Sequence, residues 1–514
     1  MTATPASWLE SIKAFCHPRV VTMLMYGFSA GIPLLLIFSS LSLWLREAGV
    51  DRATVTYFSW AALAYSFKFV WAPLVDRLPL PLLTRRLGRR RAWLLLAQVM
   101  VMLAIVLIAQ VNPARAGALE TMALAVVLLG FAAATQDVVI DAYRIESAGQ
   151  ELQALMSSSY IAGYRIGMLT SGAGSLWLAS RFGSVAGAYS FSAWHLAYMC
   201  MALAMLVGVI TTLVIREPAQ QSLRTTYTSG QYLRFLGVFA LTVLTFIGSY
   251  LLSATLASEL DVQLATLLHN EALASLLVEA ARLLLGVCCA GVMVKLLSHT
   301  YLYDAELVEA SYVAPVRDFF QRYGVRLAWL LLAFVGLYRI SDIVLGVIAN
   351  VFYQDMGFTK VEIAAVVKSF GLVMTIVGGF LGGLLALRQG VIRLLFLGAL
   401  LSAATNLLFV WLAHEGHNIH LLYLVISADN LTAGLASAAF VAFLSRLTTV
   451  SFTAVQYAIF SSLMTLLPKM IGGYSGGMVN QLGYPTFFLL TALMGLPVLW
   501  LIYRIRKHPL FRDG

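Results

Sequence analysis

Residues 135–144 read TQDVVIDAYR and close an apolar run that begins near Leu119. This run is long enough for a membrane-spanning helix, which needs about 20 mostly apolar residues. Asp137 and Asp141 are four residues apart, so on a helix the two carboxylates share one face. Ionisable groups inside a membrane are costly and mark candidate functional sites. The stretch therefore predicts an all-α polytopic membrane protein with a charged site in its interior.

The composition of the whole chain supports this class. Of the 514 residues, 60% are hydrophobic and 11% are charged, whereas about a quarter are charged in soluble domains. The formal net charge of +10 indicates a surplus of basic loop residues rather than a nucleic-acid partner, because no zinc-finger or aromatic–basic motif accompanies it. The four cysteines show neither a disulfide framework nor a metal spacing. We expect no metal site and no cofactor other than a coupling proton.

Apolar runs predict fourteen transmembrane helices. With the N-terminus in the cytoplasm, 23 of the 34 Lys and Arg residues fall in cytoplasmic segments or at the cytoplasmic ends of spans, and 5 fall in outer segments. This bias favours an inner-membrane protein with both termini in the cytoplasm. The predicted spans are 20–45, 54–76, 92–112, 118–142, 155–180, 194–215, 235–257, 273–297, 326–352, 362–386, 391–413, 420–444, 455–479 and 484–503.

The spans fall into two groups of six separated by an extra pair. We expect an N-terminal bundle over 1–218, a linker with two extra helices over 219–325, and a C-terminal bundle over 326–514. The turn at Glu47–Val50 resembles the turn at Asp355–Phe358, and Asp137 and Asp429 lie on equivalent spans. Such internal symmetry is typical of secondary transporters with a central site between two halves. Residues 298–323 could form an interfacial helix or a cytoplasmic loop, and a loop with some helix is favoured.

Small residues at a spacing of about four predict close helix contacts in two equivalent spans. The first set is Gly163, Gly167, Gly172 and Gly174, and the second is Gly472, Gly473, Gly476 and Gly477. Packing alone explains most of them, and rocking of the two halves fits both sets.

A basic loop follows the second span. Asp76 and Arg77 precede an insertion and then Gly88–Arg91, which resembles in part the loop motif of the major facilitator superfamily. Asp76 and Arg77, together with Arg144, are therefore candidate gating residues. For the individual arginines of 85–91, a role in fixing topology is favoured.

Further charges lie inside the predicted spans. Arg339 and Asp342, like Glu279 and Arg282, are three residues apart and predict pairs within one helix. Lys68, Arg165 and Lys368 are candidates for the lining of a cavity.

Asp137 and Asp141 allow two interpretations. Two neighbouring buried carboxylates repel each other, and this repulsion favours proton binding, as a proton-coupled carrier requires. Alternatively, Asp141 pairs with Arg144 and Asp137 with another cation as a static latch. Proton coupling is favoured for Asp137, whereas the two interpretations are balanced for Asp141.

Several long motifs resemble the AmpG-type muropeptide permeases of the major facilitator superfamily. They are KFVWAPLVDR (68–77), TQDVVIDAYR (135–144), YRISD (338–342), MGFTKVEI (356–363), VKSFGL (367–372) and AAFVAFLSRLTTVSFTAVQYAIFSSL (438–463). The resemblance covers nearly the whole chain, including the extra helices. It departs from the family at residues 430–434, where a more glycine-rich run is expected, and in the insertion at 301–321.

The resemblance implies a bacterial inner-membrane importer. Such a protein carries N-acetylglucosamine–1,6-anhydro-N-acetylmuramic acid and its peptides into the cytoplasm, driven by the proton motive force, for peptidoglycan recycling and β-lactamase induction. We expect a monomer in the lipid bilayer with a small glycopeptide substrate. The candidate substrate-binding residues are Lys68, Gln136, Tyr160, Tyr164, Arg165, Arg339, Asp342, Lys368, Asp429, Asn430, Gln456 and Tyr457.

Two other functions remain open. The same fold could carry another large anion such as acetyl-CoA, or the protein could be a membrane receptor that binds its ligand without moving it. An enzyme is disfavoured, because the sequence shows no paired nucleophile and base and no metal-ligand spacing.

Overall fold

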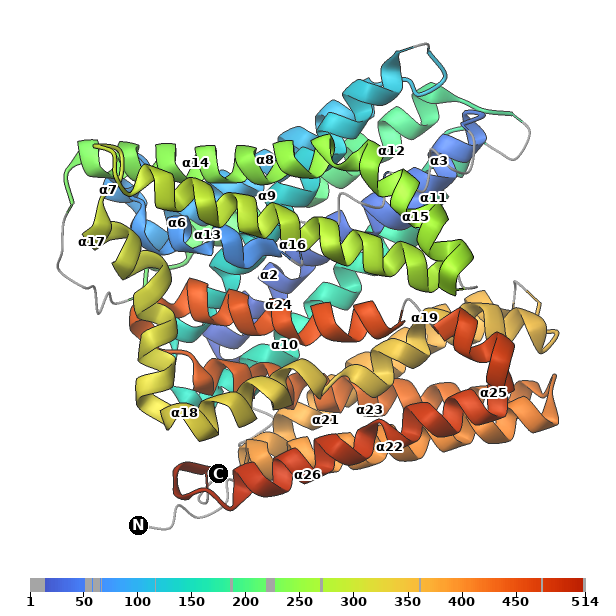
Figure 1. Ribbon diagram of the computed structural model, residues 1–514. Coiled ribbons are helices and arrows are strands. Elements are labelled where there is room, and N and C mark those ends of the chain that lie inside the picture. Colours follow the sequence, from blue (N-terminus) through green and yellow to red (C-terminus); the bar gives the residue numbers. More distant parts are fainter. Residues whose placement is uncertain are drawn as a thin grey trace.

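The computed structural model describes residues 14–50, 58, 65, 67–115, 117–184, 188–218, 227–268, 271–359, 362–472 and 475–511. These residues form a bundle of long helices that run roughly along one axis (Figure 1). That axis is the expected membrane normal.

Helices of the first half follow the predicted spans. Pro18–Glu47 is continuous helix with a wider π-type turn in its middle, and Gln150–Arg181 has the same construction. The elements are η1 (Ala14–Cys16), α2 (Pro18–Leu35), η2 (Leu36–Ser40), α3 (Leu41–Glu47), η4 (Lys68–Val70), α6 (Ala72–Arg77), α7 (Leu83–Leu87), α8 (Arg89–Gln110), α9 (Ala118–Ser147), α10 (Gln150–Leu169), η5 (Thr170–Gly174), α11 (Ser175–Arg181), α12 (Phe191–Ala204) and α13 (Leu206–Val214).

The inserted segment is more helical than predicted. A third helix, α15 (Ala254–Leu268), lies between α14 (Ser229–Leu252) and α16 (Glu271–Leu297) and packs on α16. Within 298–323, expected to be a loop with some helix, residues 305–323 are helical in α17 (Ala305–Val308), η6 (Glu309–Val313) and the first part of α18 (Ala314–Leu337). The loop prediction is therefore wrong. Buried Leu307 and Phe319 explain the order, because they give this helix an apolar face to bury.

The second half repeats the design of the first. Its elements are the rest of α18, α19 (Ile340–Asp355), η7 (Ile363–Phe370), α21 (Gly371–Gln389), α22 (Val391–Glu415), α23 (Ile419–Leu447), η8 (Val450–Phe452), α24 (Thr453–Gly472), α25 (Ser475–Leu493), α26 (Gly495–Arg506) and η9 (Pro509–Phe511). Gly324 and Gly483 break α18 and α25 with positive φ.

Eleven helices among the described residues are long and apolar enough to cross a membrane. The two continuous helices at 18–47 and 150–181 correspond to further predicted spans, and most of the span predicted at 54–76 lies outside the described residues. Fourteen spans therefore stay a prediction.

The turn repeat noticed in the sequence has the same geometry in both halves. Gly49 and Gly357 have φ values of 87° and 86°, a conformation that suits glycine. The next N–H closes the helix in each case, from Val50 to the Leu45 carbonyl at 2.9 Å and from Phe358 to the Tyr353 carbonyl at 3.0 Å. Both first spans thus end in the same helix-terminating turn.

Glycines bring pairs of helices into backbone contact. A Cβ on Gly163 would stand 2.0 Å from the Leu24 carbonyl oxygen, and one on Gly434 would stand 2.1 Å from that of Thr375. The first contact joins α2 to α10, and the second joins α21 to α23. Close packing at Gly163 and Gly167 is thereby confirmed. For Gly476, however, a Cβ would meet nothing within 4 Å.

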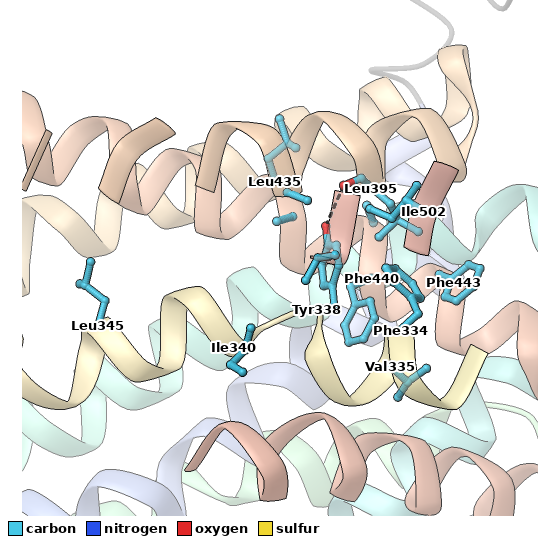
Figure 2. Close-up of a cluster of buried hydrophobic side chains, with 14 of the residues drawn as sticks. Phe334, Val335, Tyr338, Ile340, Leu345, Leu395, Leu435, Phe440, Phe443 and Ile502 are labelled. Carbon is cyan, nitrogen blue, oxygen red and sulfur yellow. Dashed lines mark hydrogen bonds between the residues drawn. The ribbon is translucent and has the colours of Figure 1, made fainter. Parts of the chain in front are cut away.

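The core of the second half fixes the break between α18 and α19. Tyr338 stacks on Phe440 with ring centroids 4.4 Å apart, and its hydroxyl donates to the Leu395 carbonyl at 3.3 Å (Figure 2). Phe334 packs on the same rings. Arg339 and Asp342 therefore follow an anchored residue, which sets the start of α19.

The two halves meet along two seams. Helix α10 packs against α21, and α24 packs against α6 and α9. These helices carry most of the charged candidates, so the predicted site lies where the halves meet.

Candidate functional site

Asp141 lies at the centre of a buried ion-pair cluster in the first half. Its carboxylate is 3.1 Å from Arg144 and 4.0 Å from the Lys68 ammonium. Arg144 is fully buried and also donates to Ser157 and, across the seam, to Ser445, each at 2.9 Å. Its guanidinium lies 5.1 Å from the ring centroid of Tyr457. One arginine thus connects the carboxylate of α9 to the second half.

Asp137 occupies the same interior, one turn away on α9. The Tyr160 hydroxyl donates to its carboxylate at 3.4 Å, and the Tyr164 ring lies 6.0 Å from that of Tyr160. Lys68 and Asp141 both act electrostatically on Asp137. The structure thus brings together both carboxylates, Lys68, Arg144, Tyr160, Tyr164 and Tyr457.

Gln136 is fully buried, yet neither polar atom of its amide has a hydrogen-bond partner among the described residues. The hydroxyl of Tyr65 is unpaired in the same sense. Leaving a buried polar group unpaired costs about 1–3 kcal/mol. These groups therefore remain available for water or a bound molecule.

A second cluster lies in the C-terminal half. Arg339 pairs with Asp342 at 3.2 Å, as the spacing predicts, and donates to Ser437 of α23 at 2.6 Å. Asp342 also accepts from Ser402 of α22. Asp429 lies on α23 within electrostatic reach of this pair.

The remaining candidates differ in what they already contact. Asn430 accepts from Thr375 at 2.9 Å, and Lys368, which is exposed, donates to Asn350 at 3.0 Å. Arg165 is half-buried and finds no carboxylate partner among the described residues. Like Lys368, it therefore has no described carboxylate that an incoming anionic group would have to displace.

At one end of the bundle, which we call the basic end, the halves are joined directly. It carries α7, α17 and the C-terminus (Figure 1). Asp76 accepts from the backbone N–H groups of Ala454 and Val455, at 3.2 and 3.0 Å, where α24 begins. Arg90 binds Asp76 at 2.7 Å and Thr453 at 2.7 Å. A carboxylate at a helix N-terminus is favourable, so this contact stabilises closure.

For the arginines of 85–91 the sequence favours a role in fixing the membrane topology, but Arg90 instead joins the two halves. It is 1% exposed and also pairs with Glu146 of α9. Arg91 donates to the Thr212 and Leu213 carbonyls, and Arg89 to that of Asp76. For Arg85 and Arg86, which are exposed, the topological role stands as a prediction.

The helical stretch 305–323, which we call the inserted helix, contacts both halves at the basic end. Arg77 donates to the Ala310 carbonyl at 2.8 Å, and Tyr312 donates to that of Val70 at 3.0 Å. On the other side, the Gln456 amide donates to the Pro315 carbonyl at 2.8 Å and to Asp318 at 2.9 Å. Gln456 therefore fastens the inserted helix and is not brought to the Asp137 cluster. The sequence order Gln456–Tyr457 hid this, because neighbours on a helix face different sides.

Sequence reasoning also missed several partners in these contacts. Glu146 is the second carboxylate for Arg90, while Ser157 and Ser445 hold Arg144. Glu146 lies two residues beyond the TQDVVIDAYR motif, so its acidic side chain at a span end was the available signal. The serines carry no such signal.

A family model matches the first part of the chain, whereas related proteins match almost all of it. The model described as acetyl-coenzyme A transporter 1 matches residues 20–228. The chain is similar to a putative transporter AmpG 4 of Rickettsia felis, with 29% identity over 96% of this chain and 98% of the relative. It is 27% identical to the anhydromuropeptide permease of Escherichia coli K12, over 97% of this chain and 82% of that protein. An uncharacterized protein of Haemophilus influenzae is 30% identical over 92% and 90%.

Solved structures agree on the fold. The fucose:proton symporter FucP of Escherichia coli has a TM-score of 0.59 at 12% identity, covering 97% of this chain and 99% of that one. The proton:xylose symporter XylE has a TM-score of 0.58 at 12% identity, covering 96% and 95%.

The helical bundle with two seams and a closed basic end thus has the major facilitator fold. Its apolar helices and its relatives, which are named as transporters and as a permease, define a multi-pass membrane transporter. Over nearly its whole length the chain is similar to proteins named as AmpG-type transporters and as an anhydromuropeptide permease, at 27–29% identity.

Proposed function

We propose that this protein imports anhydro-muropeptides from the periplasm to the cytoplasm by proton-driven alternating access. Its relatives span nearly the whole chain, and one of them is named an anhydromuropeptide permease. The observation that carries the mechanism is the contact of Arg144 with both Asp141 and Ser445, since it joins a buried carboxylate to the closing seam.

The chemistry of the step follows from this contact. A proton on Asp141 removes the negative charge that holds Arg144 and Lys68. Arg144 then loses an ion pair, and its orientation toward Ser445 weakens. Breaking one partner of a buried pair costs roughly 3–5 kcal/mol, enough to shift an equilibrium between closed and open basic ends. Asp137, one turn away on α9, is the proposed group that binds the coupling proton first, before the proton reaches Asp141.

The chemistry of muropeptides fits the side chains of the site that lack a partner among the described residues. Muropeptides carry carboxylates and sugar hydroxyls. Arg165 would receive a carboxylate, the unpaired Gln136 amide would bond hydroxyls, and the rings of Tyr160 and Tyr164 would stack on sugar faces. Lys68, Arg339, Asp342, Lys368 and Asn430 already have partners, so substrate would compete for them.

Uptake of labelled anhydro-muropeptide tests this proposal in bacterial cells that lack their own importer. We expect accumulation that a protonophore abolishes. The match to an acetyl-coenzyme A transporter model favours that anion as the second candidate. Transport of acetyl-CoA by proteoliposomes, without muropeptide uptake, would establish that alternative instead. Ligand binding without any movement would indicate a receptor.

In a bacterium that senses imported muropeptides, this import would also supply the signal for β-lactamase induction. The basic end would face the cytoplasm of the inner membrane, with both termini on that side. The protein would work as a monomer.

A further inference from the structure

A cavity lies at the basic end, outside the seams that carry the proposed transport site. Its volume is about 520 Å³, and it lies between the break in α18 and the end of α26. Gly324, with φ 69° and ψ 158°, interrupts the helix there. The six lining residues that matter are Tyr323, Val325, Arg326, Arg504, Lys507 and His508.

The cavity is basic and lacks acidic lining residues among the described part of the chain. Arg326, Arg504 and Lys507 form no ion pair with a described carboxylate. Earlier on the same helical segment, by contrast, Arg317 pairs with Glu309 and Arg322 pairs with Asp318. Three cations without a described carboxylate partner thus lie around this cavity.

Aromatic rings hold two of these cations in place. The Arg504 guanidinium lies 5.4 Å from the Trp500 ring centroid, and the Lys507 ammonium lies 4.4 Å from that of Tyr503. Both pairs are four residues apart, about one helical turn, at the end of α26 and its C-cap residue Lys507. The cations are therefore partly ordered before any anion arrives.

The surface beside the cavity is apolar. Val325 is 67% exposed, Trp329 62% and Trp500 55%. In a membrane protein, exposed aromatic residues beside basic residues mark the boundary between the hydrocarbon and the lipid headgroups. In a bilayer placed by this boundary, one wall of the cavity would adjoin acyl chains, while its cations would lie at headgroup depth.

We infer that this cavity binds the headgroup of an anionic phospholipid, with Arg326, Arg504 and Lys507 around the phosphate and the acyl chains along Val325 and Trp500. Basic pockets between helices at this depth suit such headgroups. A free phosphate would use the cations but would gain nothing from the apolar wall.

The test uses the purified full-length protein in detergent, with lipid binding measured by native mass spectrometry and thermal unfolding. The probes are phosphatidylglycerol, zwitterionic phosphatidylcholine and inorganic phosphate. We expect phosphatidylglycerol to bind and raise the Tm, and the other two to have little effect at matched concentration. Stabilisation by inorganic phosphate equal to that by phosphatidylglycerol would overturn the lipid assignment.

The decisive variant is Arg504→Gln with Lys507→Gln. Near a membrane surface each basic residue contributes about a fivefold factor in affinity, so binding of phosphatidylglycerol should weaken by at least about tenfold. The matched control is Arg85→Gln with Arg86→Gln, which removes the same charge from exposed positions of α7. The control and the exchange Arg504→Lys with Lys507→Arg should bind as the wild type does.

Unchanged binding in the double variant, or an equal loss in the control, would refute the site. If the double variant does not fold, Arg326→Gln at an exposed position takes its place. It should weaken binding by about fivefold, and wild-type affinity would refute the site equally.

Discussion

The carboxylate of Asp76 receives the backbone N–H of Val455 at 3.0 Å, across 379 residues of sequence. The contact fixes the end of α6 to the beginning of α24 and is reinforced by Arg90. Because the two helices belong to different halves, the contact must break whenever the basic end opens. It therefore offers the most direct way to perturb closure.

Replacing Asp76 by Asn removes the charge but keeps the shape. The Arg90 guanidinium then loses one of its two carboxylates and the helix N-terminus loses an anion, which together are worth about 3–5 kcal/mol. We expect the basic end to open more often. In a background without native cysteines, a cysteine at Ser445 should react with a thiol reagent several-fold faster in the Asp76→Asn protein. Unchanged reactivity would show that this contact does not hold the seam closed.

The glycine contact between α2 and α10 predicts a sharp difference within one span. Gly163→Ala would push a methyl group against the Leu24 carbonyl, whereas Gly174→Ala would meet open space. Overpacking costs about 1–3 kcal/mol, so the first variant should lower the Tm and the yield of folded protein. The second should match the wild type. Equal melting temperatures would show that α2 can move away at little cost.

Gln456→Ala separates a fastening role from substrate binding. The side chain holds the inserted helix through Pro315 and Asp318. We expect the maximal uptake rate to fall by about tenfold, because loss of these bonds costs about 1–2 kcal/mol. The KM for the muropeptide should change little. A raised KM at an unchanged maximal rate would return Gln456 to the substrate site.

Arg165→Gln should have the opposite effect, because we expect it to raise the KM rather than lower the maximal uptake rate. The side chain has no carboxylate partner among the described residues, so its loss should leave the Tm near that of the wild type. Loss of a charge-assisted bond to a substrate carboxylate costs about 1.5–3 kcal/mol, which is a rise in KM of about ten- to a hundredfold. Arg165→Lys should recover part of the affinity. If KM stays at the wild-type value in Arg165→Gln, the substrate carboxylate binds elsewhere.

Local patterns in the sequence predicted the parts of the structure that depend on neighbouring residues. Apolar runs gave the helices, and Arg339 and Asp342 gave an ion pair because three residues make one helical turn. The repeat of Gly49 and Gly357 gave matching helix ends. In each case the determining residues lie within one continuous segment of the sequence, and the glycine turn occurs once in each half.

Contacts between distant segments were harder to predict from the sequence. Arg90 appeared to belong to a basic loop, whereas its partners Glu146 and Thr453 lie 56 and 363 residues away. The sequence of the inserted helix at 305–323 looked polar. Its buried side is divided between contacts with both halves, so its apolar residues do not form one continuous stripe. Burial of this kind depends on the tertiary arrangement and leaves little periodic signal.

The proposed proton-driven import depends most specifically on Asp137. The direct measurement is accumulation of labelled anhydro-muropeptide in proteoliposomes with an imposed proton gradient, comparing the wild type with Asp137→Asn. We predict accumulation above the outside concentration for the wild type, and equilibration without accumulation for Asp137→Asn at equal protein level. Asp141→Asn in the same assay shows whether the second carboxylate couples or only latches. Undiminished accumulation by Asp137→Asn, or none by the wild type with the gradient present, would contradict the account.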